Sequence, residues 1–133
     1  MNLREIELAP FTVGDDPTAK GRIALPVCAD DRALTTVVYL EVDPGDHIPL
    51  HTHSAEETLV FLEGTGHATA GAVETEVSAG SIVVAPAFTP HGFANTGEGT
   101  LKAVGFFGTG ALVTTFDAPV TPFGTAEFLI PLR

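Results

Sequence analysis

Residues 45–64 read GDHIPLHTHSAEETLVFLEG, and this stretch decides most of what the sequence predicts about the fold. Two histidines, His51 and His53, are separated by one residue, and a carboxylate, Glu57, follows four positions after the second. In an extended strand alternate side chains point to the same face, which places the two imidazoles about 6 to 7 Å apart along the backbone. Two such imidazoles can share one ion, so the stretch predicts a strand that carries metal ligands.

A second stretch, residues 80–95, reads GSIVVAPAFTPHGFAN and adds a third histidine, His91. Imidazole and carboxylate groups are donors that divalent transition metals bind in proteins. Taken singly, each of these residues is more often a surface or satisfied core residue. The combination of three histidines with an in-phase glutamate nevertheless favours a metal site. A closed β structure can bring such separated segments around a common interior.

Both stretches fit the motifs of a known family, and the chain resembles a cupin. The first cupin motif, G-x5-H-x-H-x3-E-x6-G, is filled at every fixed position. The second, G-x5-P-x-G-x2-H-x3-N, is filled at every position but one, where Phe88 stands in place of a glycine. The resemblance covers roughly residues 34–107. It implies an all-β fold, the double-stranded β-helix form of the jelly-roll barrel.

The whole chain has the pattern of a turn-rich β domain. Helical periodicity is almost absent, and the 14 Gly and 10 Pro residues separate short β-type runs. A length of 133 residues suits one domain, with N-terminal strands in 1–33 and an extended apolar strap in 118–133. Strands are expected at 22–27, 34–42, 57–63, 67–70, 73–77, 81–85, 91–95, 101–107 and 112–116.

Charge and composition narrow the possible partners. The formal net charge is -11, and an acidic surface repels the phosphates of nucleic acids and anionic membranes. No run of 18 apolar residues and no signal-peptide pattern is found, so a cytoplasmic location is the default expectation. Cys28 is the only cysteine, and its apolar surroundings suggest a buried thiol. The apolar strap should pack on its own barrel or on a second copy, and because cupins commonly form dimers, a homodimer is expected.

The predicted metal is a divalent transition metal, with Mn, Fe, Ni and Zn as candidates that the ligand set does not separate. A cupin that keeps the motif without carrying a metal is the alternative. Four protein ligands leave two positions open at six-coordination, for water, substrate or dioxygen. Three function classes remain: an oxygenase-type enzyme similar to small bacterial monocupins that act on flavonol-like or other enol substrates, a redox-neutral isomerase, cyclase or lyase, and a non-catalytic binding protein. We favour the oxygenase, with Glu57 as ligand and, if it detaches, as catalytic base.

Aromatic residues near the motifs predict an apolar pocket for a small organic molecule. Its expected wall residues are Phe61, Phe88, Phe93 and Phe106. Phe88 occupies a turn position where glycine allows a positive φ, so a phenylalanine there would be strained or would need a different turn. Phe88 is also expected to act as a flap near the metal. Asn95 is expected to fix the backbone of its loop.

Several polar residues near the motifs are expected to stay outside the site. His47 has the same parity as His51 but lies beyond Pro49, so it is predicted to lie at a strand edge or in the pocket wall. His67 is predicted to point outward. Glu56 is predicted to be solvated, unless the bend after His53 shifts the register and exchanges it with its neighbour.

Overall fold

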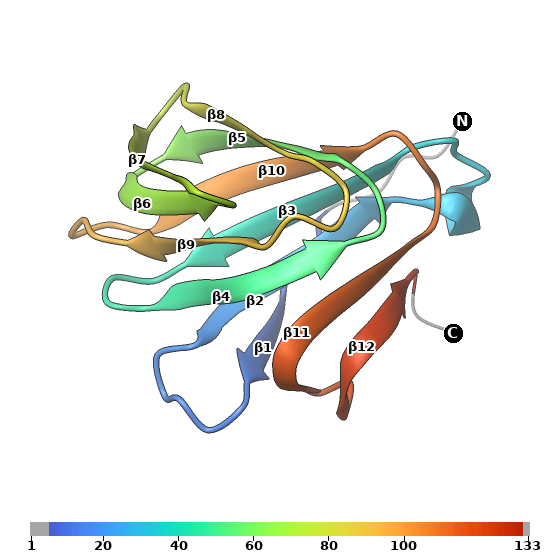
Figure 1. Ribbon diagram of the computed structural model, residues 1–133, viewed down its shortest axis with the longest axis horizontal. Coiled ribbons are helices and arrows are strands. Elements are labelled where there is room, and N and C mark those ends of the chain that lie inside the picture. The colour runs from blue at the N-terminus through green and yellow to red at the C-terminus, as the bar shows by residue number, and fades with distance from the viewer. Residues whose placement is uncertain (1–5, 132–133) are drawn as a thin grey trace.

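The computed structural model describes residues 6–131, which are built almost entirely from β-strands (Figure 1). A single 3-10 turn, Ala29–Asp31, interrupts the strands in this part of the chain. Within the same residues no helix is long and apolar enough to cross a membrane. The strands are β1 (Ala9–Val13), β2 (Lys20–Val27), β3 (Thr36–Val42), β4 (His47–His53), β5 (Glu57–Glu63), β6 (Thr65–Ala70), β7 (Val73–Ser78), β8 (Ile82–Ala85), β9 (His91–Asn95), β10 (Leu101–Phe107), β11 (Leu112–Thr121) and β12 (Thr125–Ile130).

The strands form one continuous antiparallel sheet that curls into a jelly-roll barrel, as the sequence predicted. Its order is β7-β6-β9-β4-β11-β1-β2-β3-β10-β5-β8, and β12 pairs with β11 beside this path. In Figure 1, β3, β10 and β5 run side by side in the upper part of the barrel, and the β11–β12 hairpin lies at the lower right. Strands that are distant in sequence therefore become neighbours, and β4 lies between β9 and β11.

The core lies inside the barrel because alternate residues of each strand point inward. On β3 every second residue is buried, and β10 follows the same pattern over its whole length. The largest completely buried side chains come from β3, β5, β10 and β11, and they are those of Phe61, Phe107, Leu101, Val42 and Val120.

The turn between β3 and β4 confirms the sequence prediction. The backbone N–H of Asp46 donates to the carbonyl of Asp43 at 3.1 Å, and Gly45 has a φ of 84°. This is the positive angle that the third position of a type II turn requires. Gly45 is also the first fixed residue of the first motif, and β4 begins two residues later, at His47.

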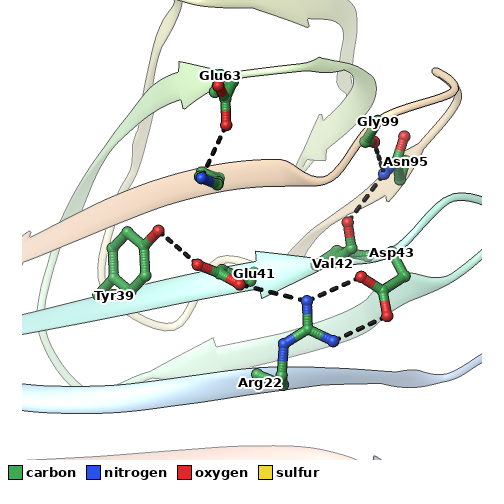
Figure 2. Close-up of polar contacts among 9 residues, drawn as sticks. Arg22, Tyr39, Glu41, Val42, Asp43, Glu63, Asn95 and Gly99 are labelled. Atoms are coloured by element: carbon green, nitrogen blue, oxygen red, sulfur yellow. Dashed lines mark hydrogen bonds and ion pairs between the residues drawn. The ribbon is translucent and has the colours of Figure 1, made fainter. Parts of the chain in front are cut away.

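Asn95 is the last residue of β9, and it fixes the loop between β9 and β10, as expected. Its side-chain Nδ2 donates to the carbonyls of Val42 and Gly99, both at 2.8 Å (Figure 2). Its Oδ1 accepts from the backbone N–H of Gly97 at 2.9 Å. All of these partners are backbone groups, so Asn95 fixes the loop rather than the cluster of histidines.

Nine strands lie in the expected ranges, although β11 continues past its expected end. Of the other three, β4 is the strand expected to carry His51 and His53, β1 lies within the expected N-terminal strands, and β12 lies within the expected strap. The expected apolar strap forms the end of β11 and all of β12, and its last two residues, 132–133, lie outside the described residues. β12 pairs as a hairpin mainly with the first half of β11. Pro119 is tolerated inside β11 because the register shifts between Thr115 and Val120, and the Pro119 carbonyl accepts from Gly14 N–H. Phe123 and Phe128 of this hairpin pack against the core.

Candidate metal centre

The three motif histidines and the motif glutamate come together inside the barrel. His51 and His53 lie on β4, and His91 begins β9 directly opposite His51 in the pairing of the two strands. Glu57 is the first residue of β5. All four side chains are buried, and one candidate ligand atom from each lies within 4.8 Å of the others. The structure thus assembles the predicted set, and its binding of an ion stays a prediction.

Glu57 reaches the cluster from across the barrel. The chain bends at Ser54 and Ala55, and the strand that follows, β5, does not pair with β4. The partners of β5 are β8 and β10, whereas those of β4 are β9 and β11. The carboxylate therefore faces the histidines from a separate part of the sheet. Its Oε1 lies 2.9 Å from Nε2 of His91 and 3.6 Å from Nε2 of His53.

A bulge in β4 selects which histidines point inward. The pairing of β4 with β9 shifts register between Ile48 and His51, so the inward side changes parity across Pro49. His47 consequently lies outside the cluster although its number suggests the same face. Its half-exposed ring has Nδ1 3.4 Å from the hydroxyl of Thr18. This agrees with the predicted strand-edge position.

The other two polar residues also lie outside the cluster. The ring of His67 has Nδ1 2.9 Å from the Glu76 carboxylate at the surface, as predicted from its outward orientation. Glu56 is exposed, and the buried carboxylate is the one of Glu57. The register that the first motif implied is therefore the one that the strands adopt.

Each histidine of the cluster is oriented by a hydrogen bond at Nδ1. His51 Nδ1–H donates to the carbonyl of Pro49 at 2.8 Å, and His91 Nδ1–H donates to the carbonyl of Thr89 at 2.9 Å. His53 Nδ1 lies 2.8 Å from the buried hydroxyl of Thr114, its cross-strand partner on β11. A carbonyl only accepts, so the proton sits on Nδ1 and leaves Nε2 for another partner. Such outer partners fix the tautomer and orientation of metal-binding histidines.

Burial keeps two of the imidazoles neutral. It lowers the pKa of His51 to about 3, with a further contribution from the nearby His91. It lowers the pKa of His53 to about 2 in the same way. For His91 burial also favours the neutral ring, but the hydrogen bond and charge of Glu57 outweigh it and raise the pKa of His91. A divalent metal requires neutral imidazoles, so His91 would give up the Nε2 proton that it shares with Glu57 on binding one.

A small cavity of about 50 Å³ adjoins the cluster and is lined by His51, His53 and Glu57 on its polar side. Its other walls are almost wholly apolar. Phe116 of β11 stacks on His51, with ring centroids 4.6 Å apart and planes 18° apart. The remaining aromatic walls come from β1 and the β11–β12 hairpin, and they are Phe11, Phe123 and Phe128.

The phenylalanines expected in the pocket wall lie elsewhere, which corrects the sequence interpretation. Phe61 and Phe93 contact each other edge to face in the core, with centroids 5.2 Å apart. Phe106 points to the outer side of β10 and is 45% exposed. Phe88 is 70% exposed, and its side chain does not line the cavity. Position in the motif did not indicate which face of the sheet each ring occupies.

The Phe88 backbone nevertheless adopts the conformation that its motif position implies. Its φ is 61°, a region that costs a bulky L-residue roughly 1–2 kcal/mol. Its N–H donates to the carbonyl of His53 at 2.8 Å, which ties the loop before β9 to the end of β4. The flap role of the ring stays a prediction.

Comparison with known proteins identifies the family. The cupin domain model matches residues 38–107, which is more than half of the chain. The chain therefore belongs to the cupin family. No curated protein matches it.

Solved structures share the fold at low sequence identity. A predicted oxalate decarboxylase from Thermotoga maritima is 20% identical, with 80% of this chain and 97% of that chain covered and a TM-score of 0.69. A protein from Acidithiobacillus ferrooxidans, proposed to be a sugar phosphate isomerase, is 22% identical over 75% of this chain and 67% of that chain, with a TM-score of 0.58. Oxalate decarboxylase from Bacillus subtilis is 19% identical over 68% of this chain, with a TM-score of 0.62, and the match spans 26% of that longer chain. These likenesses show the fold alone.

Proposed function

We propose that this cupin is a metal-dependent enzyme of the oxygenase type that acts on a small organic molecule in the cavity beside the cluster. One observation carries the proposal. Three buried histidines, each held at Nδ1, converge with a buried carboxylate at the polar end of an otherwise apolar cavity.

The residues fit a divalent transition metal by their donor chemistry. Three imidazole nitrogens and one carboxylate oxygen are a ligand set for such ions, and the four atoms are already close together. A bound redox-active ion would supply the Lewis acidity and electron transfer that oxidation of an organic molecule by dioxygen requires. The ligand set does not choose among Mn, Fe, Ni and Zn, although zinc would supply Lewis acidity only.

The cavity walls favour an oxygenase over an enzyme that moves protons. An isomerase or lyase needs an acid or base beside the carbon atoms of its substrate. Among the residues that line the cavity, the titratable side chains are the candidate ligands His51, His53 and Glu57. Glu57 is then the single carboxylate in the lining that could act as a base, so no acid or base separate from the ligands serves an isomerase or lyase. An apolar cavity also suits dioxygen, which is itself apolar.

Metal content is the first test. Protein purified without added metal should contain close to one equivalent of a transition metal by elemental analysis. His51→Ala and His91→Ala should each lose it, because each removes a buried donor. His67→Ala is the matched control, since its ring pairs with Glu76 at the surface and should leave the metal content unchanged. Retention of stoichiometric metal by both cluster variants would reject the site.

Dioxygen dependence tests the reaction type. With a panel of small phenols and enols, an oxygenase consumes dioxygen in step with substrate and stops under anaerobic conditions. Turnover that continues without dioxygen would replace the oxygenase by a redox-neutral metal enzyme. Ligand affinity without turnover of any compound would leave a binding protein.

A further inference from the structure

We infer that the cavity beside the cluster binds a single small ring that carries an oxygen donor and is uncharged or singly ionised, and that it excludes small dianions and sugar phosphates. The inference rests on the proposed function, because the oxygen donor is directed at a metal held by the four motif residues. Three properties of the cavity carry it, namely its charge, the polarity of its walls and its size.

The positively charged side chains that the structure describes lie away from the cavity. Arg22 is held by Asp43, with two contacts of 2.8 Å, and by Glu41 at 3.3 Å (Figure 2). Lys102 contacts Glu63 at 2.9 Å on β10 and β5. Arg22 and Lys102 are thus committed to carboxylates, and the other two cations in the described part of the chain, Lys20 and Arg32, are also absent from the cavity lining.

The charge balance of the loaded site therefore selects the ligand. A divalent ion together with ionised Glu57 carries a net charge near +1, because neutral imidazoles add nothing. A neutral or singly ionised donor keeps the total at +1 or brings it to zero. A dianion such as oxalate would leave a net negative charge among apolar walls, and an unpaired buried charge is strongly unfavourable.

The walls offer no hydrogen bonds to a polyhydroxylated ligand. The hydroxyl of Thr114, the remaining polar side chain in the lining, already contacts His53 Nδ1. The ring of Phe116 stacks on His51, and Phe123 and Phe128 add further aromatic surface. A sugar would lose its hydrogen bonds with water and gain none, whereas an aromatic ring would pack against ring faces.

Size limits the ligand to about one ring. The cavity volume is about 50 Å³. One water needs roughly 10–15 Å³ in this measure, so the space holds about three to five waters. A closed apolar cavity of about 150 Å³ accepts benzene, so even one ring fills this smaller cavity and extends into its open mouth. A flavonol, which has three rings, exceeds this space unless the β11–β12 hairpin moves.

Calorimetry on the manganese-loaded protein tests the inference with phenol, oxalate and 1-naphthol as probes. Phenol should bind at least about tenfold more tightly than either of the others, because only phenol meets both the charge and the size limits. Thermal denaturation provides a second readout, in which phenol alone raises the unfolding temperature. Metal content is measured after each titration, because oxalate also chelates ions in solution.

A pair of variants on one strand tests the size limit. Phe128→Ala removes a half-buried wall residue and should raise the affinity for 1-naphthol by about tenfold, since the cavity gains the volume of a ring. Leu129→Ala is the matched control, because Leu129 is exposed and does not line the cavity. Its affinities for all three probes should equal those of the unmodified protein.

The outcomes separate this inference from the proposed function. Retained metal with tighter binding of phenol supports both, whereas retained metal with oxalate bound as tightly as phenol overturns the inference and leaves the metal site standing. If the protein retains no metal, the proposed function fails, and phenol binding by the metal-free protein still decides the nature of the cavity. Absence of phenol binding in both forms overturns the inference.

Discussion

The Nε2 atom of His91 lies 2.9 Å from Oε1 of Glu57, although the two residues begin strands that are far apart in the order of the sheet. This contact joins β9 to β5 across the inside of the barrel. It also couples the protonation of the imidazole to the carboxylate, because Glu57 counteracts the effect of burial and raises the pKa of His91. The pair is therefore central to how the cluster accepts a cation.

Glu57→Gln should weaken metal binding severely while keeping the shape of the side chain. The change removes the negative charge that offsets the cation in a buried site. We expect a loss of affinity greater than the roughly 10–100-fold loss that follows changes in outer partners of a metal ligand. Competition with a chelator measures the affinity. Glu56→Gln, one residue earlier and exposed, should leave the affinity unchanged, and equal losses in both variants would contradict the role of Glu57.

Gly105→Ala should displace the Glu57 carboxylate without touching a histidine. A Cβ at Gly105 would collide with Oε2 of Glu57 and lie 3.0 Å from Cγ2 of Val38. We expect metal affinity to fall by at least about tenfold. Gly105 leaves room for the carboxylate of Glu57, and residues that position a metal ligand typically change the affinity by this much. Gly108→Ala is the control, since a Cβ there meets nothing within 4 Å. An unchanged affinity in Gly105→Ala would show that the carboxylate does not need its present position.

Thr114→Val tests the orientation of His53. The substitution keeps the volume but removes the hydroxyl that lies 2.8 Å from His53 Nδ1 in a buried position. Metal affinity should fall roughly 10–100-fold, and Thr114→Ser should restore most of it because the hydroxyl returns. Thr115→Val changes the next residue, whose hydroxyl contacts Glu127 at the surface, and should have no effect on the metal.

Tyr39 provides a pH test outside the site. Burial, assisted by the hydrogen bond that its hydroxyl donates to Glu41 at 2.7 Å, raises the pKa of Tyr39 to about 12. Tyrosine in an unfolded chain ionises near pH 10, so the folded state keeps its proton longer. This stabilisation is complete below about pH 10 and is lost as the pH rises towards the folded value of about 12.

The measurement is direct because Tyr39 is the only tyrosine and the chain has no tryptophan. Ultraviolet absorbance of tyrosinate should show a single transition near pH 12 while circular dichroism reports a folded chain. Glu41→Gln should lower the midpoint towards 10, because the acceptor charge is removed. A midpoint near 10 in the folded protein would contradict the burial of this hydroxyl.

The sequence was sufficient to predict the pair of histidines on β4 because a local rule sets their relative orientation. Alternation along β4 places His51 and His53 on one face, beyond the register shift between Ile48 and His51. The positive φ at Phe88 was also implied by the motif, although the residue there is not glycine. Local backbone geometry is encoded by neighbours in the chain, so it can be read without the fold.

The cavity was not predictable in the same way, because its walls depend on the path of the whole chain. Phe116, Phe123 and Phe128 enter it only because the C-terminal hairpin folds back over the barrel, and Phe11 enters from the other end of the sequence. The approach of Glu57 from across the barrel has the same cause. The apolar C-terminal segment did indicate part of this arrangement, since apolar side chains of that kind are expected to pack against another surface.

Self-association remains a prediction, and the structure gives it a specific surface. The outer sides of β8, β5 and β10 form an apolar face in which Val84, Thr58 and Phe106 are aligned across the strands, followed by Ile82, Val60 and Val104. Ile82 is 63% exposed and Val84 is 50% exposed. Because the chain has a net charge of -11, two copies repel through most of their surfaces, and an uncharged face is where a second copy can approach.

The double substitution Ile82→Lys and Val84→Lys should therefore convert a homodimer into a monomer, as measured by size-exclusion chromatography with light scattering. Charged side chains on this face would have to be buried without partners in the dimer. Val73→Lys is the control, because Val73 is 65% exposed at the start of β7 and is not one of the aligned residues of this face. A monomeric unmodified protein at micromolar concentration would reject self-association, and a dimer that survives the double substitution would place the interface elsewhere.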